Sequence, residues 1–499
     1  MIQVILESSK NIDESMKRSL ELISFNLLTW FIFIIGFLSY TSALILRHFW
    51  FQTSAWDLGI FDQAIFLISK GLPAQSSLLG FHILGDHGAL ILYPLGLISN
   101  IFPSILYLFF IQGFVLSSAV FPLSRLAISR GLSKRSFLAS LLMLLLYPVV
   151  FNVAIFDFHP EVIAFPLILE IIILLEKKEN LCLWKLFIYL VFVLTCKVSL
   201  SLLVFGIGIS VVIKGRKLLG SLIIGLASIW LYLIGFLLIP AFGNENARLI
   251  RHASKFGFAN ENVFDINNSA LLITQLFKQA FSLSTFEYIF LLIIPVIYLI
   301  FHFNRTNILF SLVPFAPLFL LNVFSAQPSL KDLVHQYSLF LVPFLADSVQ
   351  QTLAPGLQGI NGYPIWMRRR LPEILLFWMV FIFLILSRAS FFFGTFQERL
   401  NTASDRRAVI SKVHPSSALL TSNDLVPHLS RRKKINFITN ENLDQINEFD
   451  QILIDEIHPG WQSSKEIVDR LLMQLNTSES WVELYRSGSV VLFQKNSRL

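Results

Sequence analysis

Long runs of apolar residues, separated by short polar loops, dominate the first four-fifths of the chain. A helix that crosses the hydrocarbon core of a membrane needs about 20 predominantly apolar residues. The runs that meet or approach this length cover residues 22–46, 105–123, 137–154, 162–176, 218–241, 286–303, 306–324 and 372–393. The pattern therefore predicts an all-α polytopic membrane protein.

Three further apolar runs need a separate interpretation. Residues 186–213 have basic clusters at both ends, which one helix would place on opposite sides, so we expect two short helices with Lys197 near the turn. Residues 338–353 form a short, weaker span. Residues 88–101 are short and broken by Pro94, so we expect a re-entrant helix. With a cytoplasmic N-terminus, this gives about eleven spans.

The composition changes after residue 393. Charged residues then occur throughout, between short β-like runs (SALLTS, INFITN, QILID) and an amphipathic run, KEIVDRLLMQL. The last segment, WVELYRSGSVVLFQK, predicts a hairpin around Ser487-Gly488. We therefore expect a cytoplasmic tail over residues 1–21, a membrane domain over 22–393 and a small extracytoplasmic α/β domain over 394–499.

Composition and charge support a membrane protein and argue against a nucleic-acid-binding one. Of the 499 residues, 55% are hydrophobic and 14% are charged, whereas soluble domains contain about 25% charged residues. The net charge is +7, but the basic residues form short clusters between apolar runs, such as Arg368, Arg369 and Arg370. This is the distribution that the positive-inside rule predicts for cytoplasmic loops. The two cysteines imply no disulfide framework.

Ionisable residues gather in the loops that this topology places on the outer side. The first is AWDLGIFDQAIF, with Asp57 and Asp62, whose spacing alone favours a helix cap and a solvated side chain. The second, FHILGDHGALILYP, contains Asp86 and His87.

A third loop, IFDFHPEVIAFP, carries Asp157, His159 and Glu161 within five residues. Capping of the following helix explains one acidic residue, but not an Asp, a His and a Glu together. Ionisable groups at a membrane edge are expensive to desolvate and are therefore candidate functional residues.

Other charged residues on the same side have two interpretations each. Lys197 either extends its amine to the interface or binds a phosphate or an acidic group. His335 and Tyr337 follow in LKDLVHQYSLFLVPF, and Arg248 and Arg251 form a basic patch that is either a binding surface or a solvated loop. A divalent metal is compatible with this set of residues, although HExxH and CxxC patterns are absent from the sequence.

Several of these segments resemble a known family. AWDLGIFDQAIF, LGDHGALILYPLGLI, FDFHPEVIAFPLIL, HQYSLFLVPFL and SNDLVPHLSRR are similar, in order and spacing, to the prokaryotic membrane-protein family known as domain of unknown function 2079. That family resembles the GT-C glycosyltransferases, polytopic enzymes that take sugars from polyprenyl-phosphate carriers. The resemblance implies that Asp57 and Asp157 are the acidic residues of the first and second outer loops. Where the family commonly has Lys-Glu-Asp, this chain has Lys197-Val198-Ser199.

These observations predict a glycosyltransferase in the cytoplasmic membrane that moves a sugar from a polyprenyl-phosphate donor to a glycan or protein acceptor at the outer face. The alternatives are a transporter or flippase and a non-catalytic scaffold. A transporter should have charges at mid-membrane depth and internal repeats, whereas the charges here cluster at one face. The candidate catalytic residues are Asp57, Asp157 and His159. The candidate substrate-binding residues are Asp62, Asp86, His87, Glu161, Lys197, Arg248, Arg251, His335 and Tyr337.

Overall fold

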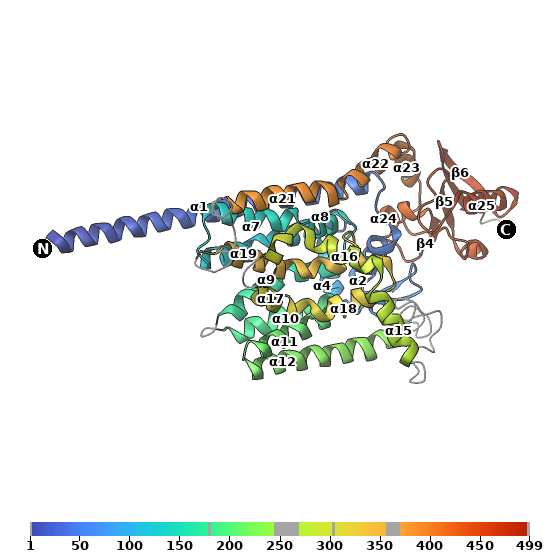
Figure 1. Cartoon of the computed structure of the whole chain (residues 1–499). Coiled ribbons are helices and arrows are strands. Elements are labelled where there is room, and N and C mark those ends of the chain that lie inside the picture. Colours follow the sequence, from blue (N-terminus) through green and yellow to red (C-terminus); the bar gives the residue numbers. More distant parts are fainter. Residues whose placement is uncertain (1, 178–180, 244–268, 302–304, 356–369, 497–499) are drawn as a thin grey trace.

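The computed structural model describes residues 2–177, 181–243, 269–301, 305–355 and 370–496. Helices form a bundle, α1 extends from one end of it, and a strand-containing domain lies at the other end (Figure 1). The first elements are α1 (Ile2–Phe49), η1 (Ala55–Gly59), α2 (Ile60–Ser69), β1 (Gln75–Ser76), β2 (Phe81–His82), α3 (Leu84–His87), α4 (Leu92–Ile101), α5 (Leu106–Ser118), α6 (Val120–Ser129), α7 (Lys134–Leu146), α8 (Pro148–Ile155), η2 (Pro160–Ile163) and α9 (Ala164–Glu176).

The second half of the bundle continues with shorter and more broken helices. They are α10 (Leu183–Cys196), α11 (Leu200–Ile213), α12 (Lys217–Trp230), η3 (Leu231–Leu238), α13 (Ile239–Phe242), α15 (Ser269–Ala280), α16 (Leu283–Ile293), η6 (Ile294–Phe301), α17 (Arg305–Leu312), η7 (Val313–Phe315), α18 (Ala316–Phe324), η8 (Pro328–Lys331), η9 (Gln336–Leu341), α19 (Val342–Leu353), α21 (Leu371–Leu386) and α22 (Ala389–Arg399).

The described residues contain four helical segments long and apolar enough to cross a membrane: Ser19–Phe49, Leu106–Ser129, Lys217–Phe242 and Leu371–Arg399. Two bent helix pairs, Lys134–Leu146 with Pro148–Ile155 and Ala270–Ala280 with Leu283–Leu299, raise the number to six if each is one span. Four shorter apolar helices accompany them. A multi-pass helical membrane domain is therefore supported, and the total of about eleven spans stays a prediction.

One local expectation is met in full: the run 186–213 is divided between α10 and α11, and Lys197 lies in extended conformation between them. The run 88–101 yields only the ten-residue helix α4, which is too short to cross a membrane by itself. That this helix is re-entrant stays a prediction.

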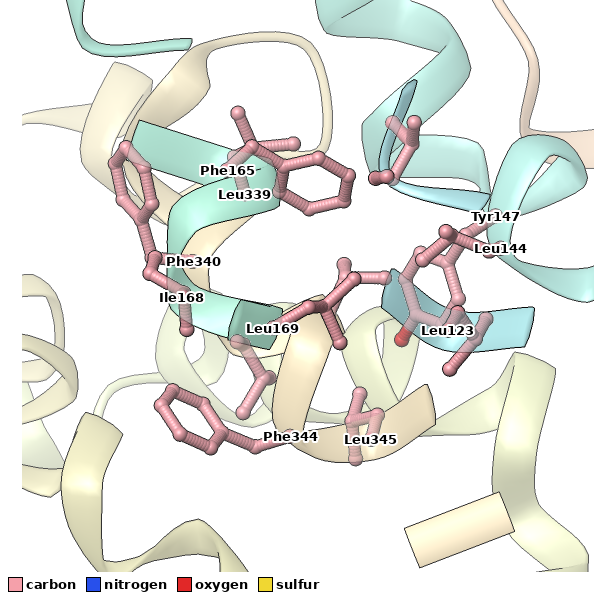
Figure 2. Close-up of a cluster of buried hydrophobic side chains, with 14 of the residues drawn as sticks. Leu123, Leu144, Tyr147, Phe165, Ile168, Leu169, Leu339, Phe340, Phe344 and Leu345 are labelled. Atoms are coloured by element: carbon pink, nitrogen blue, oxygen red, sulfur yellow. The ribbon is translucent and has the colours of Figure 1, made fainter. Parts of the chain in front are cut away.

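The bundle is held by a continuous apolar core and is itself surrounded by exposed apolar side chains. Figure 2 shows part of this core, to which α6, α7, α9, η9 and α19 contribute. On the outside of the bundle, Phe236 and Phe377 are 65% and 74% exposed. Large apolar side chains that face outward on long helices are stable when lipid is the surrounding solvent.

The C-terminal domain begins with α23 (Ala403–Ile410) and contains a five-stranded sheet in the order β4-β3-β5-β7-β6. β3 (Leu419–Thr421), β4 (Ile435–Phe437) and β5 (Gln451–Asp455) are parallel, and β7 (Val490–Lys495) runs antiparallel to β5 and to β6 (Trp481–Ser487). The remaining elements are η11 (Asn423–Leu425), α24 (Val426–Leu429), η12 (Leu443–Glu448) and α25 (Lys465–Thr477). The predicted hairpin and amphipathic helix are confirmed.

This domain packs on the loops at one end of the bundle. A shared apolar cluster joins Phe51 and Leu58 of the first loop to Val426 and Leu453 of the C-terminal domain. The contact fixes the first loop between the bundle and the sheet, and this is where the candidate site lies.

Candidate functional site

Asp57 occupies a strained turn in the first loop. Its backbone angles are φ 65° and ψ −86°, in the region of the γ-turn that side-chain-bearing residues rarely adopt. Such conformations persist only where the surrounding structure enforces them, and they cluster at functional sites. The turn separates Ser54 from the start of α2 and leaves the Asp57 side chain 33% exposed, whereas most of the loop is buried.

His159 is the direct partner of Asp57. Its Nε2 lies 3.3 Å from Asp57 Oδ1, and its side chain is 2% exposed. The other ring nitrogen, Nδ1, lies 2.8 Å from the backbone oxygen of Asp157. Since a carbonyl oxygen only accepts hydrogen bonds, Nδ1 carries a proton, and Nε2 is the ring nitrogen that faces the Asp57 carboxylate. The backbone N–H of His159 donates to Gln112 Oε1, which holds the loop against α5.

Asp157 holds the first and third loops together. Its Oδ2 accepts a hydrogen bond from the backbone N–H of Ser54 at 2.9 Å, and its Oδ1 lies 3.6 Å from Arg47 Nη1. Arg47 in turn donates to the backbone oxygens of Ile155 and Gln52. The Asp157 side chain is 2% exposed, and both of its oxygens face groups of the segment 47–54.

A second buried ion pair involves Glu161, two residues after His159. Lys197 Nζ is 2.5 Å from Glu161 Oε1, and the two side chains are 8% and 1% exposed. The same Nζ lies 5.0 Å from the centroid of the Tyr337 ring. The backbone N–H of Val198 donates to the backbone oxygen of His87, which ties the α10–α11 turn to α3.

The charges in this cluster shift one another's protonation. Burial alone would raise the pKa of Asp57, but the charge and hydrogen bonding of His159, assisted by His87 and Lys197, hold that pKa at about 2. Burial lowers the pKa of His159, and Asp57 more than reverses this effect, so the pKa is raised. Burial raises the pKa of Asp157 to about 6, with Arg47 opposing the change. Asp57 is therefore ionised at neutral pH.

A cavity of about 560 Å³ lies near the cluster, between α16, η8 and the α21–α22 junction. Its lining combines charged and apolar side chains, among them Lys331, Asp332, Arg388, Leu291 and Phe391. Asp332 Oδ2 lies 2.7 Å from His335 Nδ1. The His335 ring is 5.4 Å from that of Phe156, which is 6.0 Å from that of His159. Through these rings, the loop that contains Asp332 and His335 lies beside the Asp57–His159 pair.

Residues 47–492 match the family model described as a predicted membrane protein (DUF2079). The chain belongs to this family. The resemblance that its motifs suggested is therefore confirmed. None of the curated protein sequences matches the chain at a significant level.

Two solved structures of ArnT from Cupriavidus metallidurans share the fold of this chain. The one bound to undecaprenyl phosphate has a TM-score of 0.56 at 11% identity, and the apo form has 0.55 at 10%. Each comparison covers 96% of this chain and 98% of ArnT. Likeness at this identity concerns the fold alone.

The remaining candidate residues lie in different places. His87 pairs with Asp86 on α3, next to the α10–α11 turn. Asp62 is fully buried and contacts the C-terminal domain: its Oδ2 accepts from Ser430 Oγ at 2.6 Å, and its Oδ1 lies 3.5 Å from Arg431 Nη1. These contacts tether the C-terminal domain to α2. Arg248 and Arg251 lie outside the described residues.

The described residues do not assemble a metal site, because no three His, Cys, Asp or Glu side chains among them are grouped to hold an ion. Asp57 and His159 are two side chains of metal-ligating type that lie together, and Glu161 is engaged by Lys197.

Sequence reasoning missed two cationic residues. Arg47, the partner of Asp157, lies near the end of α1, and Arg388 lines the cavity next to α22. Both lie at the ends of apolar runs that the predicted topology placed on the outer side, where positive charge is unusual. That departure from the positive-inside rule was the available signal.

Proposed function

We propose that this protein is a membrane glycosyltransferase that moves a sugar from a polyprenyl-phosphate donor to an acceptor at the outer face of the cytoplasmic membrane. The observation that carries the proposal is the Asp57–His159 pair: an ionised, partly exposed carboxylate in a strained turn, backed by a buried histidine. The fold shared with ArnT, solved with undecaprenyl phosphate, supports a lipid-linked donor. The N-terminus is cytoplasmic and the C-terminal domain extracytoplasmic in this proposal.

The proposed reaction is a displacement with inversion at the anomeric carbon of the donor sugar. An acceptor hydroxyl oxygen forms the new bond to that carbon while the bond from the carbon to the phosphate oxygen breaks. The hydroxyl proton passes to the Asp57 carboxylate, and the electron pair of the broken bond stays on the polyprenyl phosphate. Positioned proton transfer of this kind contributes about 10²–10⁴-fold to the rate.

In this scheme, His159 and Asp157 position the carboxylate of Asp57, which takes the proton of the acceptor hydroxyl. The hydrogen bond from His159 Nδ1 to Asp157 O fixes the ring so that Nε2 faces Asp57. Asp157 fixes the start of the strained turn through Ser54. Both residues act through Asp57.

The leaving phosphate needs cationic groups, which stabilise charge that develops in the transition state. Lys331 and Arg388 line the cavity near the pair, and its apolar wall suits the start of a prenyl chain. Lys197 is a second candidate, because an ammonium that donates to Glu161 keeps two further N–H groups. His335 and Tyr337 lie beside these cations and complete the proposed donor site.

The test is glycosyl transfer by the full chain reconstituted in liposomes with a panel of polyprenyl-phosphate sugars. Asp57→Asn keeps the side-chain size but removes the proton acceptor, so the rate should fall by about 10²-fold or more while donor affinity changes little. Lys197→Ala should instead weaken donor binding. Asp444→Asn, on the exposed surface of the C-terminal domain, is the matched control.

Two results would contradict the proposal. Equal rates for wild type and Asp57→Asn would remove Asp57 from the chemistry. A protein that forms no glycoside with any donor, but moves a lipid or solute across the membrane in an Asp57-dependent way, would be a transporter.

A further inference from the structure

We propose that Trp56 and Trp461 form a stacking platform for a sugar ring of the acceptor, and hence that the acceptor is a glycan. This inference rests on the proposed function, because it names the substrate class of the same site. The two indole rings meet edge to face, with centroids 5.7 Å apart and an interplanar angle of 84°. Trp461 is 53% exposed, and Trp56 is half-buried against Phe437 at 6.2 Å.

The platform lies where the parallel strands of the C-terminal domain end. Phe437 is the last residue of β4, Asn423 follows β3, and Trp461 lies in the loop after β5. In open α/β sheets, ligands bind in the crevice outside the carboxyl ends of the strands, next to the point where the strand order reverses. Here β3 lies between β4 and β5, so the chain leaves β3 toward β4 and then crosses back past β3 to reach β5. This edge of the sheet faces the first loop of the membrane domain, through Asn423.

The loop that presents Trp461 is held in an unfavourable conformation. Gln462 has a φ of 59°, which side-chain-bearing residues rarely adopt, and Gly460 has a φ of 86°. A Cβ at Gly460 would lie 2.7 Å from Asn423 Cβ, so only glycine fits. Asn423 Oδ1 in turn accepts from Ser54 Oγ at 3.2 Å and from the Ala55 N–H at 3.4 Å. The exposed indole is therefore fixed against the segment that leads into the strained turn.

Two features identify the ligand of this platform as a glycan: the chemistry of the indole rings and the position of Trp56 next to Asp57 in the sequence. A pyranose ring with equatorial substituents presents a flat face of C–H groups, which packs on an indole ring while its hydroxyls stay in water. Trp56 directly precedes Asp57, so the Cα atoms of these two residues are about 3.8 Å apart. In this proposal, a glycan whose ring stacks on Trp461 extends past Trp56 toward Asp57. The platform therefore holds the acceptor, and the cavity near Lys331 remains for the donor.

The experiment measures binding of cellohexaose and chitohexaose to the full chain in lipid nanodiscs, without any donor, by saturation-transfer NMR and calorimetry. Trp461→Ala should weaken binding about tenfold, the loss expected for one stacked ring. Trp461→Phe should retain part of the affinity, because a smaller aromatic face remains. Trp184→Ala is the control, since Trp184 is 63% exposed on the remote helix α10.

The outcomes separate this inference from the proposed function. Failure of both oligosaccharides to bind wild type at about 10 mM, or equal binding by Trp461→Ala and wild type, would overturn the platform and leave the Asp57 chemistry standing. Binding that depends on Trp461, in a protein that transfers no sugar from any polyprenyl-phosphate donor, would support the platform and overturn the proposed function.

Discussion

The buried pair of Lys197 and Glu161 allows a sharp test of whether this lysine is structural or substrate-binding. The variants are Lys197→Met, Glu161→Gln and the double variant that carries both substitutions. Each single substitution leaves one ionisable group buried without its partner, since the two side chains are 8% and 1% exposed. The double substitution removes both charges and keeps comparable side-chain volumes.

The loss of stability in Lys197→Met can be estimated from the free energy needed to protonate Glu161 once its partner is gone. A buried Glu161 without Lys197 can become neutral by taking up a proton, and for a carboxyl with an ordinary pKa of 4.5 this costs about 3.4 kcal/mol at pH 7. That cost is an upper bound for the unpaired charge, and it agrees with the roughly 3–5 kcal/mol measured when buried pairs are broken. At pH 5 the same protonation costs about 0.7 kcal/mol. Lys197→Met should therefore destabilise strongly at pH 7 and much less at pH 5.

The assay is equilibrium unfolding in detergent at both pH values, followed by Trp fluorescence. The double variant should recover at least about 2 kcal/mol relative to the sum of the single variants. Arg135→Met is the control, because Arg135 and its partner Glu373 are 76% and 46% exposed and such pairs contribute about 0–1 kcal/mol. Additive costs in the double variant, or a loss for Lys197→Met that does not depend on pH, would refute the reasoning. A double variant that is stable but no longer binds donor would identify Lys197 as a phosphate ligand.

Two further predictions concern the site and its support. His159→Gln removes the group that holds the Asp57 pKa at about 2, so the pKa of Asp57 should rise and the acid limb of the plot of transfer rate against pH should move to higher pH. Wild type should lose activity on the alkaline side, because His159, whose pKa is raised, gives up its proton there. An unchanged acid limb would show that the pair does not control Asp57. Asp62→Ala removes from α2 the buried acceptor of Ser430 Oγ and the carboxylate beside Arg431, at a cost of about 1–3 kcal/mol. It should speed proteolysis between α22 and α23, and cleavage no faster than in Asp444→Ala would show that Asp62 does not tether the domain.

The sequence predicted the membrane domain well because hydropathy reports directly on the solvent around a helix. The division of 186–213 at Lys197, the short helix at 92–101 and the strands of the C-terminal domain all follow from local pattern. The number of spans does not follow in the same way, because several apolar runs form bent or short helices. One example is the α7–α8 pair, whose axes are bent by 47° near Pro148.

The site was predicted in part, for a physical reason. Asp157, His159 and Glu161 stand out in the sequence because they are close together, and the structure brings His159 next to Asp57 of a distant loop. Partners separated by more than a hundred residues, such as Arg47 with Asp157, depend on tertiary packing, which periodicity does not encode. Asp62 shows the opposite failure: its spacing from Asp57 suggested a solvated side chain, which is wrong, because Asp62 is fully buried against Ser430 and Arg431 of the C-terminal domain.

The three carboxylates of the cluster differ in function because they differ in their access to water. A buried charge is tolerated only when it is paired, and Asp157 and Glu161, 2% and 1% exposed, each have a cationic partner that links two loops. Asp57 is also paired, but its side chain is 33% exposed, so a reactant can approach it without breaking the pairs beneath. In the proposed reaction, the dense motif DFHPE therefore builds the support, and the isolated Asp57, in a turn that the support keeps strained, is the residue that reacts.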